Sequence, residues 1–500
     1  MRRAAAATLM VQGTGSSVGK SFIVAGLCRY YAKLGLKVAP FKAQNMALNA
    51  AVTASGHEIG RAQAAQAMAA GIEPTIEMNP ILLKPEADSR SQVIYLGRSI
   101  GSYAASDYLE LRRQLWPGVV RSLRSLQRDH DLVILEGAGS PVELNLRRGE
   151  IVNMRMAAVA NSPVILVGDI ERGGIFASML GTLDLLCARD RARVRGLLVN
   201  RFRGDRSLFE GGARLLARRS GLPVLGVVPY LPGLGLPAED SLELTEVQSV
   251  KRSGALDVAL VATERISNFD EFQLLAREPV VSLRLVRSSS ELGQPDLIII
   301  PGTKMTASDL LALRRANMST AIVQAAATGS AVIGICGGYQ ILGEVIRDIQ
   351  GVELKGAHPG LALLPVQTDF DAPAKITRRN QGEVVAGHGL LGYARGLKVQ
   401  GYEIRFGRLA TRGVAAWQLN QEPEGCLSSD GWILGTSLHG LFDNHELRAA
   451  ILHALTDRKG LAPPRPGVLT DPFEAASRAL MLSMDLRRLE TVIWPSERSS

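Results

Sequence analysis

The chain has 500 residues, so at roughly 100–200 residues per domain it is expected to hold two to four domains. Its 46% hydrophobic and 21% charged residues are typical of a globular protein and argue against a largely disordered chain. The net charge of +9 is spread over small basic groups and aromatic residues make up only 5%, which disfavours nucleic-acid binding.

The beginning of the chain, Met1 to Ala7, mimics a secretion signal, but its apolar run continues into a glycine-rich motif and is better interpreted as a strand. Since no run of about 18 consecutive apolar residues occurs, no membrane span is predicted. The four cysteines form no CxxC pair, which predicts neither a disulfide framework nor a zinc site and favours a cytoplasmic location.

The first 232 residues alternate short apolar runs with helical patterns, which predicts a doubly wound α/β domain with a parallel sheet. The runs predicted as buried strands are Leu9–Val11, Lys37–Phe41, Asp131–Leu135, Pro163–Val167, Gly196–Val199 and Val224–Val228. Residues 233–254, rich in Pro and Gly and then acidic, are predicted to be a linker.

The same pattern restarts after the linker and predicts a second doubly wound α/β domain over residues 255–450. Its predicted strands are Leu256–Val261, Leu297–Ile300, Ala331–Ile335 and Trp432–Leu434. Residues 451–500 are predicted to be a C-terminal tail that caps the second domain or forms a contact surface.

A phosphate-binding loop is predicted at residues 13–21, GTGSSVGKS, between the first strand and a helical run. Backbone N–H groups are expected to surround the phosphates of ATP, with Lys20 reaching the β- and γ-phosphates and the Ser21 hydroxyl binding Mg²⁺. The ATP-binding candidates of the loop are Gly13, Thr14, Gly19, Lys20 and Ser21. Gly13 is one residue farther from Gly19 than in the common pattern, a spacing that resembles dethiobiotin synthetase and its relatives, which phosphorylate carboxylates.

Polar residues at other strand ends extend this predicted ATP site. Glu136 and Asp169 each end an apolar run, and carboxylates beside a phosphate loop are natural Mg²⁺ ligands. Lys42 is expected to neutralise phosphate or a developing acyl phosphate, and Asn200 to read the adenine edge.

A cysteine follows the apolar run 331–335 in the sequence GICGGYQ, which predicts a sharp turn between a strand and a helix. A helix N-terminus favours the thiolate form of Cys336, the expected nucleophile. The backbone N–H groups of Gly337 and Gly302 are candidate oxyanion donors. His439 follows another apolar run and is the expected base, because the carboxyl ends of neighbouring parallel strands meet in space.

The surroundings of Cys336 and His439 resemble the class I glutamine amidotransferases, specifically their cobyrinate-amidating branch. Most class I members follow the histidine with Pro-Glu, and that glutamate orients the imidazole. Here Gly440 and Leu441 follow instead, so the orienting group is not at the usual place. Asp443 and Glu446 are the candidate substitutes.

Over roughly residues 1–450 the chain resembles the cobyric acid synthase family, whose motifs occur in order across both domains. The matching segments include VAPFKAQNMALN at 38–49, MNPILLKP at 78–85, EGAGSPVELNL at 136–146, VNRFRGD at 199–205 and SLHGLF at 437–442.

The resemblance implies a carbon–nitrogen ligase of cobalamin biosynthesis that amidates the b, d, e and g carboxylates of adenosylcobyrinic acid a,c-diamide. ATP and Mg²⁺ are the implied cofactors, and L-glutamine is the implied nitrogen donor. The first domain would activate each carboxylate as an acyl phosphate, and Cys336 with His439 would release ammonia from glutamine.

Two alternatives remain open. Cobyrinic acid a,c-diamide synthase has the same two-domain organisation, although the QNM, MNPILLKP and RFRGD segments favour cobyric acid synthase. A partitioning-type ATPase with a degenerate glutaminase domain is disfavoured, because Gly15 stands where such proteins carry an extra lysine and because Cys336 and His439 are both present.

Overall fold

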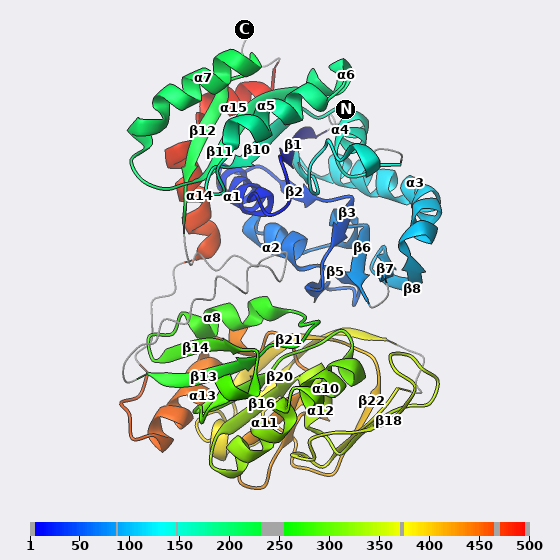
Figure 1. The fold of residues 1–500 in the computed structure, drawn as a ribbon, viewed down its shortest axis with the longest axis vertical. Helices are drawn as coiled ribbons and strands as arrows, with labels where there is room; N and C mark the ends of the chain where they lie inside the picture. Colours follow the sequence, from blue (N-terminus) through cyan, green and yellow to red (C-terminus); the bar gives the residue numbers. More distant parts are fainter. Residues whose placement is uncertain are drawn as a thin grey trace. The chain divides into compact units, whose positions relative to one another are not determined.

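The computed structural model describes residues 6–86, 89–146, 149–231, 255–370, 375–464 and 471–495, and these form two compact units (Figure 1). Of the described residues, unit 1 contains 6–47, 58–231 and 471–495, and unit 2 contains 48–57 and 255–464. The predicted linker at 233–254 lies outside the described residues. No helix in the described ranges has both the length and the apolar character needed to cross a membrane.

A six-stranded parallel sheet forms the centre of unit 1, and its strands confirm all six predicted apolar runs. In spatial order the strands are β12 (Val224–Pro229), β11 (Val194–Phe202), β10 (Val164–Asp169), β1 (Ala7–Gly13), β9 (Leu132–Glu136) and β2 (Val38–Phe41). The chain lies on one side of β1 until β9 and then crosses to β10 on the other side. Such a reversal places a ligand site at the carboxyl ends of the strands, which is where the phosphate-loop motif begins.

Helices connect these strands, as the alternating pattern predicts. They are α1 (Lys20–Lys33), α2 (Arg61–Ala69), α3 (Ala105–Asp129), α4 (Met154–Ala160), α5 (Ile175–Leu185), α6 (Ala188–Arg191) and α7 (Glu210–Ser220). Between β2 and α3 the chain adds a four-stranded sheet that the apolar pattern did not predict. Its strands are β3 (Gln44–Met46), β6 (Ile81–Pro85), β7 (Arg90–Tyr95) and β8 (Arg98–Ala104), and β5 (Glu58–Gly60) lies in the same region of the chain.

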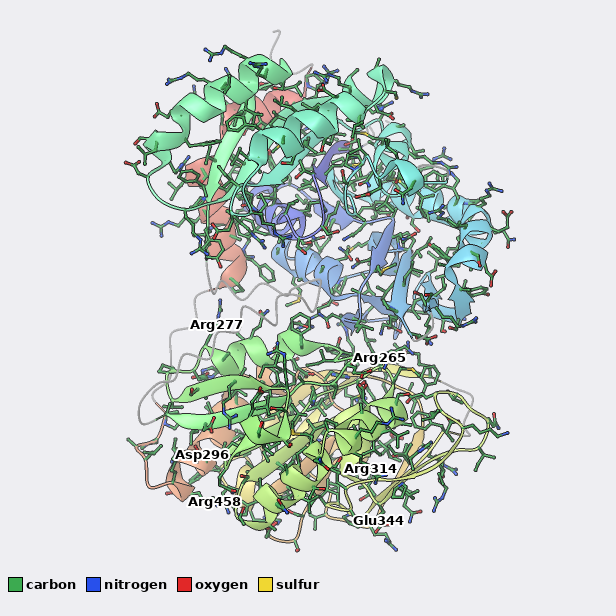
Figure 2. All side chains as sticks on the ribbon, in the orientation of Figure 1. Arg265, Arg277, Asp296, Arg314, Glu344 and Arg458 are labelled. Carbon is green, nitrogen blue, oxygen red and sulfur yellow. The ribbon has the colours of Figure 1, made fainter. Side chains whose placement is uncertain are left out.

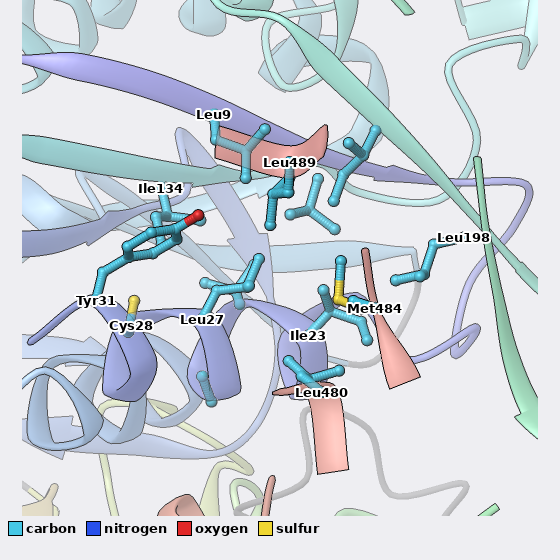
Figure 3. Packing of buried hydrophobic residues seen from close by; sticks show 14 of the residues in the cluster. Leu9, Ile23, Leu27, Cys28, Tyr31, Ile134, Leu198, Leu480, Met484 and Leu489 are labelled. Atoms are coloured by element: carbon cyan, nitrogen blue, oxygen red, sulfur yellow. The ribbon is translucent and has the colours of Figure 1, made fainter. Parts of the chain in front are cut away.

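The C-terminal helices α14 (Pro472–Ser483) and α15 (Leu486–Ile493) belong to unit 1, so this part of the tail does not cap the second domain. Leu480 and Leu489 join Ile23 and Leu27 of α1 in one buried apolar cluster (Figure 3). A Cβ atom at Gly26 would lie 2.6 Å from Leu480 Cδ1, so α1 carries a glycine where α14 comes closest. The tail packs here because its apolar residues complete this cluster.

Unit 2 is built on a second six-stranded sheet, which confirms the four strands predicted for it. The order is β14 (Val281–Val286), β13 (Leu256–Val261), β15 (Leu297–Ile300), β16 (Ala331–Ile335), β26 (Ile433–Thr436) and β25 (Cys426–Leu427), with only β25 antiparallel. The sequence VSLRLV of the edge strand β14 alternates between buried and half-buried positions, so it lacks the continuous apolar run by which the others were predicted.

Helices and two four-stranded sheets surround this core. The helices are α8 (Gln273–Ala276), α9 (Ser289–Leu292), α10 (Thr306–Arg315), α11 (Met318–Ala327), α12 (Gly337–Leu342) and α13 (His445–Arg458). One sheet contains β18 (Gly356–Pro359), β17 (Val345–Asp348), β19 (Val366–Asp369) and β22 (Arg408–Thr411). The other contains β21 (Lys398–Arg405), β20 (Ile376–Val384), β23 (Trp417–Leu419) and β24 (Glu422–Glu424), and β4 (Ala50–Val52) also belongs to unit 2. Helix α13 extends beyond residue 450, the predicted domain end.

If α14 stabilises unit 1 through this cluster, Leu480→Ala should lower the free energy of unfolding by about 2–5 kcal/mol, because it leaves a cavity in a packed core. Urea denaturation followed by circular dichroism measures the change. Leu482→Ala on the same helix is the matched control, since Leu482 is 72% exposed, and it should change stability by less than about 0.5 kcal/mol. Equal effects of the two substitutions would contradict the assignment.

Candidate functional site

The phosphate loop of unit 1 joins the end of β1 to the start of α1, as predicted. Gly19 has φ of +96°, and a Cβ atom there would lie 2.0 Å from Asn200 Nδ2, so only glycine fits this position. The same amide nitrogen donates a hydrogen bond to Val18 O at 2.9 Å. Asn200 therefore contacts the backbone of the loop; reading of adenine by Asn200 remains a prediction.

The side chain of Lys20 is buried between two loops. Its ammonium donates to Gly15 O at 2.8 Å and to Gly139 O at 3.2 Å. The second carbonyl belongs to the EGAGS loop after β9, which Asn153 braces by donating to Ala138 O at 2.7 Å. The lysine expected to contact phosphates is thus held at the junction of the two loops.

Glu136 is the centre of the polar cluster beside the phosphate loop. Its Oε1 accepts from Ser21 Oγ at 2.9 Å and from Lys42 Nζ at 3.0 Å, and its Oε2 accepts from Gln66 Nε2 at 2.5 Å. Burial raises the pKa of Glu136, whereas the charge of Lys42 and the hydrogen bonds from Gln66 and Lys42 lower it. The lowering effects together are larger, so the pKa lies below its ordinary value. The cluster therefore holds an ionised carboxylate next to Ser21.

Gln66 was not singled out from the sequence. The signal available in the sequence is a glutamine among the alanines of the short helix α2. In the structure this glutamine is 1% exposed. A buried amide on such a helix is expected to have a polar partner, and here the partner is Glu136.

Asp169, the other predicted Mg²⁺ ligand of unit 1, lies in a different setting. Its Oδ2 is 3.2 Å from Arg201 Nη1 and 3.6 Å from Arg172 Nε, and its Oδ1 accepts from Glu171 N. The structure therefore brings Glu136 to Ser21 and pairs Asp169 with arginines.

The donor set near the loop suits a metal that is held together with a nucleotide. Within the described ranges no cluster of three or more His, Cys, Asp or Glu side chains is arranged to hold a metal ion. Ser21 and Glu136 supply two neighbouring oxygens. Mg²⁺ is typically bound by one or two protein oxygens, with phosphates and water completing its shell, so these residues fit Mg²⁺ bound with ATP.

In unit 2 the predicted strand–turn–helix arrangement around Cys336 is present. Cys336 has φ of +51°, an uncommon backbone conformation for a residue with a side chain, and it stands between β16 and α12. A Cβ atom at Gly338 would lie 2.0 Å from Ile300 O, so the turn requires glycine there. The Cys336 thiol contacts Ile404 O at 3.5 Å and is 6% exposed.

Parallel pairing of β16 with β26 brings His439 to Cys336. Ile335 is paired with Thr436, and Cys336 N donates to Thr436 O at 2.8 Å. The His439 imidazole, three residues further on, lies close enough to Cys336 for this cysteine to raise the pKa of the imidazole. Tyr402 fixes this histidine through two backbone hydrogen bonds and stacks on its ring at a centroid distance of 5.3 Å.

The carboxylate that orients His439 is Glu271, in the 3₁₀ turn Phe269–Phe272 after β13. Its Oε1 is 3.1 Å from His439 Nδ1, and its Oε2 accepts from Gly440 N at 3.0 Å. The prediction of Asp443 or Glu446 for this role is wrong, because these nearby residues are exposed whereas Glu271 is buried against the ring. The signal available in the sequence is the adjacent pair Asp270 and Glu271 in SNFDEF, a few residues after the apolar strand β13.

Glu271 decides the protonation of His439. Burial lowers the pKa of His439, but Glu271 and Cys336 raise it, to about 10. The arrangement therefore favours an imidazolium beside the Cys336 sulfur. Among the charged residues of the same unit that Figure 2 labels, Glu344 is half-buried and Arg458 is exposed.

Both predicted oxyanion donors are close to this group. A Cβ atom at Gly302 would lie 2.9 Å from His439 Cε1, and one at Gly337 would lie 2.6 Å from Thr303 Cγ2. Both glycines thus allow close packing around the cysteine turn, while their role toward an oxyanion remains a prediction.

Replacing Glu271 should change the titration of His439. In Glu271→Gln the charge of Glu271 is lost while burial and Cys336 remain, so the pKa of His439 should fall from about 10. NMR of ¹³C-labelled histidine, assigned with His439→Gln, measures this value. Glu446→Gln is the control and should leave it unchanged; a pKa that stays near 10 in Glu271→Gln would refute the role of Glu271.

Comparison with known proteins agrees with the two-unit organisation. Residues 9–243 match the CobQ/CobB/MinD/ParA nucleotide binding domain, and residues 257–447 match the CobB/CobQ-like glutamine amidotransferase domain. Solved structures that match part of the chain include a glutamine amidotransferase (18% identity, 41% of this chain and 99% of that chain, TM-score 0.29) and MinD of Aquifex aeolicus (15% identity, 46% and 84%, TM-score 0.27).

Similarity to curated relatives extends over nearly the whole chain. The cobyric acid synthase of Moorella thermoacetica is 44% identical, over 98% of this chain and 97% of the relative. That of Pelotomaculum thermopropionicum is 46% identical over 97% and 93%, and that of Sorangium cellulosum is 44% identical over 98% and 99%. This chain therefore belongs to the cobyric acid synthase family.

Proposed function

We propose that the chain amidates the b, d, e and g carboxylates of adenosylcobyrinic acid a,c-diamide with ATP and L-glutamine. The observation that carries the proposal is that His439 lies beside Cys336 and is 3.1 Å from Glu271 Oε1, in a chain that also holds Lys20, Ser21 and Glu136 at a phosphate loop. One part can release nitrogen and the other can activate an acid. Family membership supports the choice of substrate.

The cysteine unit is suited to releasing ammonia from glutamine. The Cys336 thiolate attacks the side-chain amide carbon, and the His439 imidazolium, held by Glu271, protonates the departing nitrogen. Ammonia leaves, and water cleaves the thioester to give glutamate and restore the thiol. The backbone N–H groups of Gly302 and Gly337 stabilise the oxyanion in this scheme.

The phosphate-loop unit is suited to activating the acid. A carboxylate resists attack because of its negative charge and its poor leaving group. ATP, when bound with Mg²⁺, would supply the phosphoryl group that converts this carboxylate to an acyl phosphate. Lys20 and Lys42 offset negative charge during transfer, Ser21 and Glu136 hold the metal, and Gln66 keeps Glu136 in place. Ammonia then displaces phosphate and leaves the amide.

Separate loss of the two activities would test this division. Cys336→Ser should lower glutamine-dependent amidation by more than about a thousandfold, because the nucleophile is lost. It should spare amidation with ammonium salt at high pH, where ammonia is unprotonated. Lys20→Ala should abolish both. Loss of both activities in Cys336→Ser would contradict the proposal.

Mass spectrometry of the corrinoid product distinguishes the alternatives. Four exchanges of OH for NH₂ on the a,c-diamide are expected. Amidation of cobyrinic acid at the a and c positions instead would identify a cobyrinic acid a,c-diamide synthase. ATP hydrolysis without glutamine hydrolysis would favour the partitioning-type ATPase.

The two predicted metal-binding carboxylates can be compared directly. Glu136→Gln should lower both glutamine- and ammonia-dependent amidation by at least about a hundredfold, because a charged ligand beside Ser21 is lost. Asp169→Asn keeps the size of the side chain and should reduce both activities far less, since Asp169 is paired with arginines. A titration of amidation against Mg²⁺ concentration should reach half of its maximal rate at a higher metal concentration only in Glu136→Gln; the reverse pattern would assign the metal to Asp169.

A further inference from the structure

Residues 48–57 come from the N-terminal part of the chain but belong to unit 2. They contain β4, and Val52 O accepts a hydrogen bond at 2.8 Å from Arg379 Nε of β20. The chain enters this segment from β3 and leaves it into β5, both in unit 1. The segment is thus a loop of the nucleotide-binding region packed into the glutaminase unit.

Two buried hydrogen bonds fasten this segment to Asn268. Asn268 N donates to Asn49 Oδ1 at 2.7 Å, and Ala50 N donates to Asn268 Oδ1 at 2.8 Å. Asn49 and Asn268 are 2% and 3% exposed, so loss of either bond would leave a buried polar group without compensation by water. Asn268 has φ of +54°, a conformation that asparagine tolerates better than most residues.

Asn268 is part of the turn that carries Glu271. Glu271 N donates to Asn268 O at 3.1 Å, and the Glu271 carboxylate contacts His439 Nδ1 and Gly440 N. The position of Asn49 therefore bears on the carboxylate that holds the imidazole beside Cys336.

The other end of this connection is at the ATP site. Lys42 precedes Asn49 by seven residues, and its ammonium shares Glu136 Oε1 with Ser21. The chain between Lys42 and Asn49 is held by backbone hydrogen bonds, because β3 pairs with β6 and Ala47 N donates to Leu83 O at 3.0 Å. A ligand that engages Glu136 alters the surroundings of Lys42 at the start of this braced stretch.

We propose that residues 48–57 are a control segment, in which Asn49 and Asn268 act as positioning residues that make the setting of Glu271, and with it the rate of glutamine hydrolysis, depend on occupation of the ATP site. The inference rests on the proposed function for both sites. Its physical content is a coupling free energy between nucleotide binding and the geometry of the cysteine site. This coupling would restrict the release of ammonia from glutamine to the state in which ATP is bound and a corrinoid carboxylate can be activated.

Hydrogen–deuterium exchange of the full chain tests the connection without turnover. Adding Mg²⁺ and AMP-PNP, an ATP analogue with a non-hydrolysable γ-phosphate, should slow exchange of residues 265–272 in the wild type. In Asn49→Ala this response should be lost. Asn268→Gly is the second variant, since glycine accepts the same backbone conformation and only the bond to Ala50 N disappears.

Glutamine hydrolysis provides the second readout. Wild-type kcat should rise about fivefold or more with Mg²⁺, AMP-PNP and the corrinoid substrate, with little change in KM. Both variants should lose this rise while retaining ammonia-dependent amidation. Ser55→Ala is the control, because Ser55 lies in the exposed turn of the same segment, where its hydroxyl bonds to Thr53 and His57 of that turn.

The outcomes are decisive. An exchange response and a rate increase that persist in both variants, or that are absent from the wild type, would overturn the control segment. A wild type that shows the exchange response but amidates no corrinoid even with ammonia would instead refute the proposed function. If Asn49→Ala does not fold, Asn268→Gly alone decides.

Discussion

Parallel strand pairing is the constraint on which both sites depend. It gathers the carboxyl ends of strands that are far apart in sequence, so that Cys336 meets His439 and the loop after β1 meets Glu136 at the end of β9. The reacting groups thus come from strand ends, while the strands themselves are almost entirely apolar. A register shift between β16 and β26 would separate the thiol from its base with no change in either residue.

Each site contains buried charges that are satisfied by an opposite charge and by hydrogen bonds. Glu136 is paired with Lys42 and Glu271 with His439, and in each case the carboxylate has a further donor, Gln66 or Gly440 N. Such pairs contribute little net stability compared with apolar packing, but removal of one partner typically costs about 3–5 kcal/mol. They are better understood as fixing the ionisation and the orientation of groups that must be charged for their chemistry.

Most of the fold and part of the sites could be predicted from the sequence. Buried parallel strands are continuous apolar runs, which is why β1, β9, β16 and β26 were identified, and the phosphate loop and the cysteine turn carry local glycine patterns. Other features depend on contacts that no local pattern encodes. Glu271 and Gln66 act on residues distant in sequence, β14 is an edge strand without an apolar run, and the partner of the C-terminal helices is decided by the shape of the surface they cover.

The position of α14 and α15 has a consequence for how the chain is made. The α1 surface that they cover includes Ile23 and Leu27, which leave the ribosome long before Leu480 and Leu489. Until α14 and α15 have been translated, the N-terminal unit must exist with this apolar face exposed to solvent. The same topology makes the two halves poor candidates for division into separate genes, because a cut after the first 231 residues would leave the nucleotide-binding half without two of its own helices.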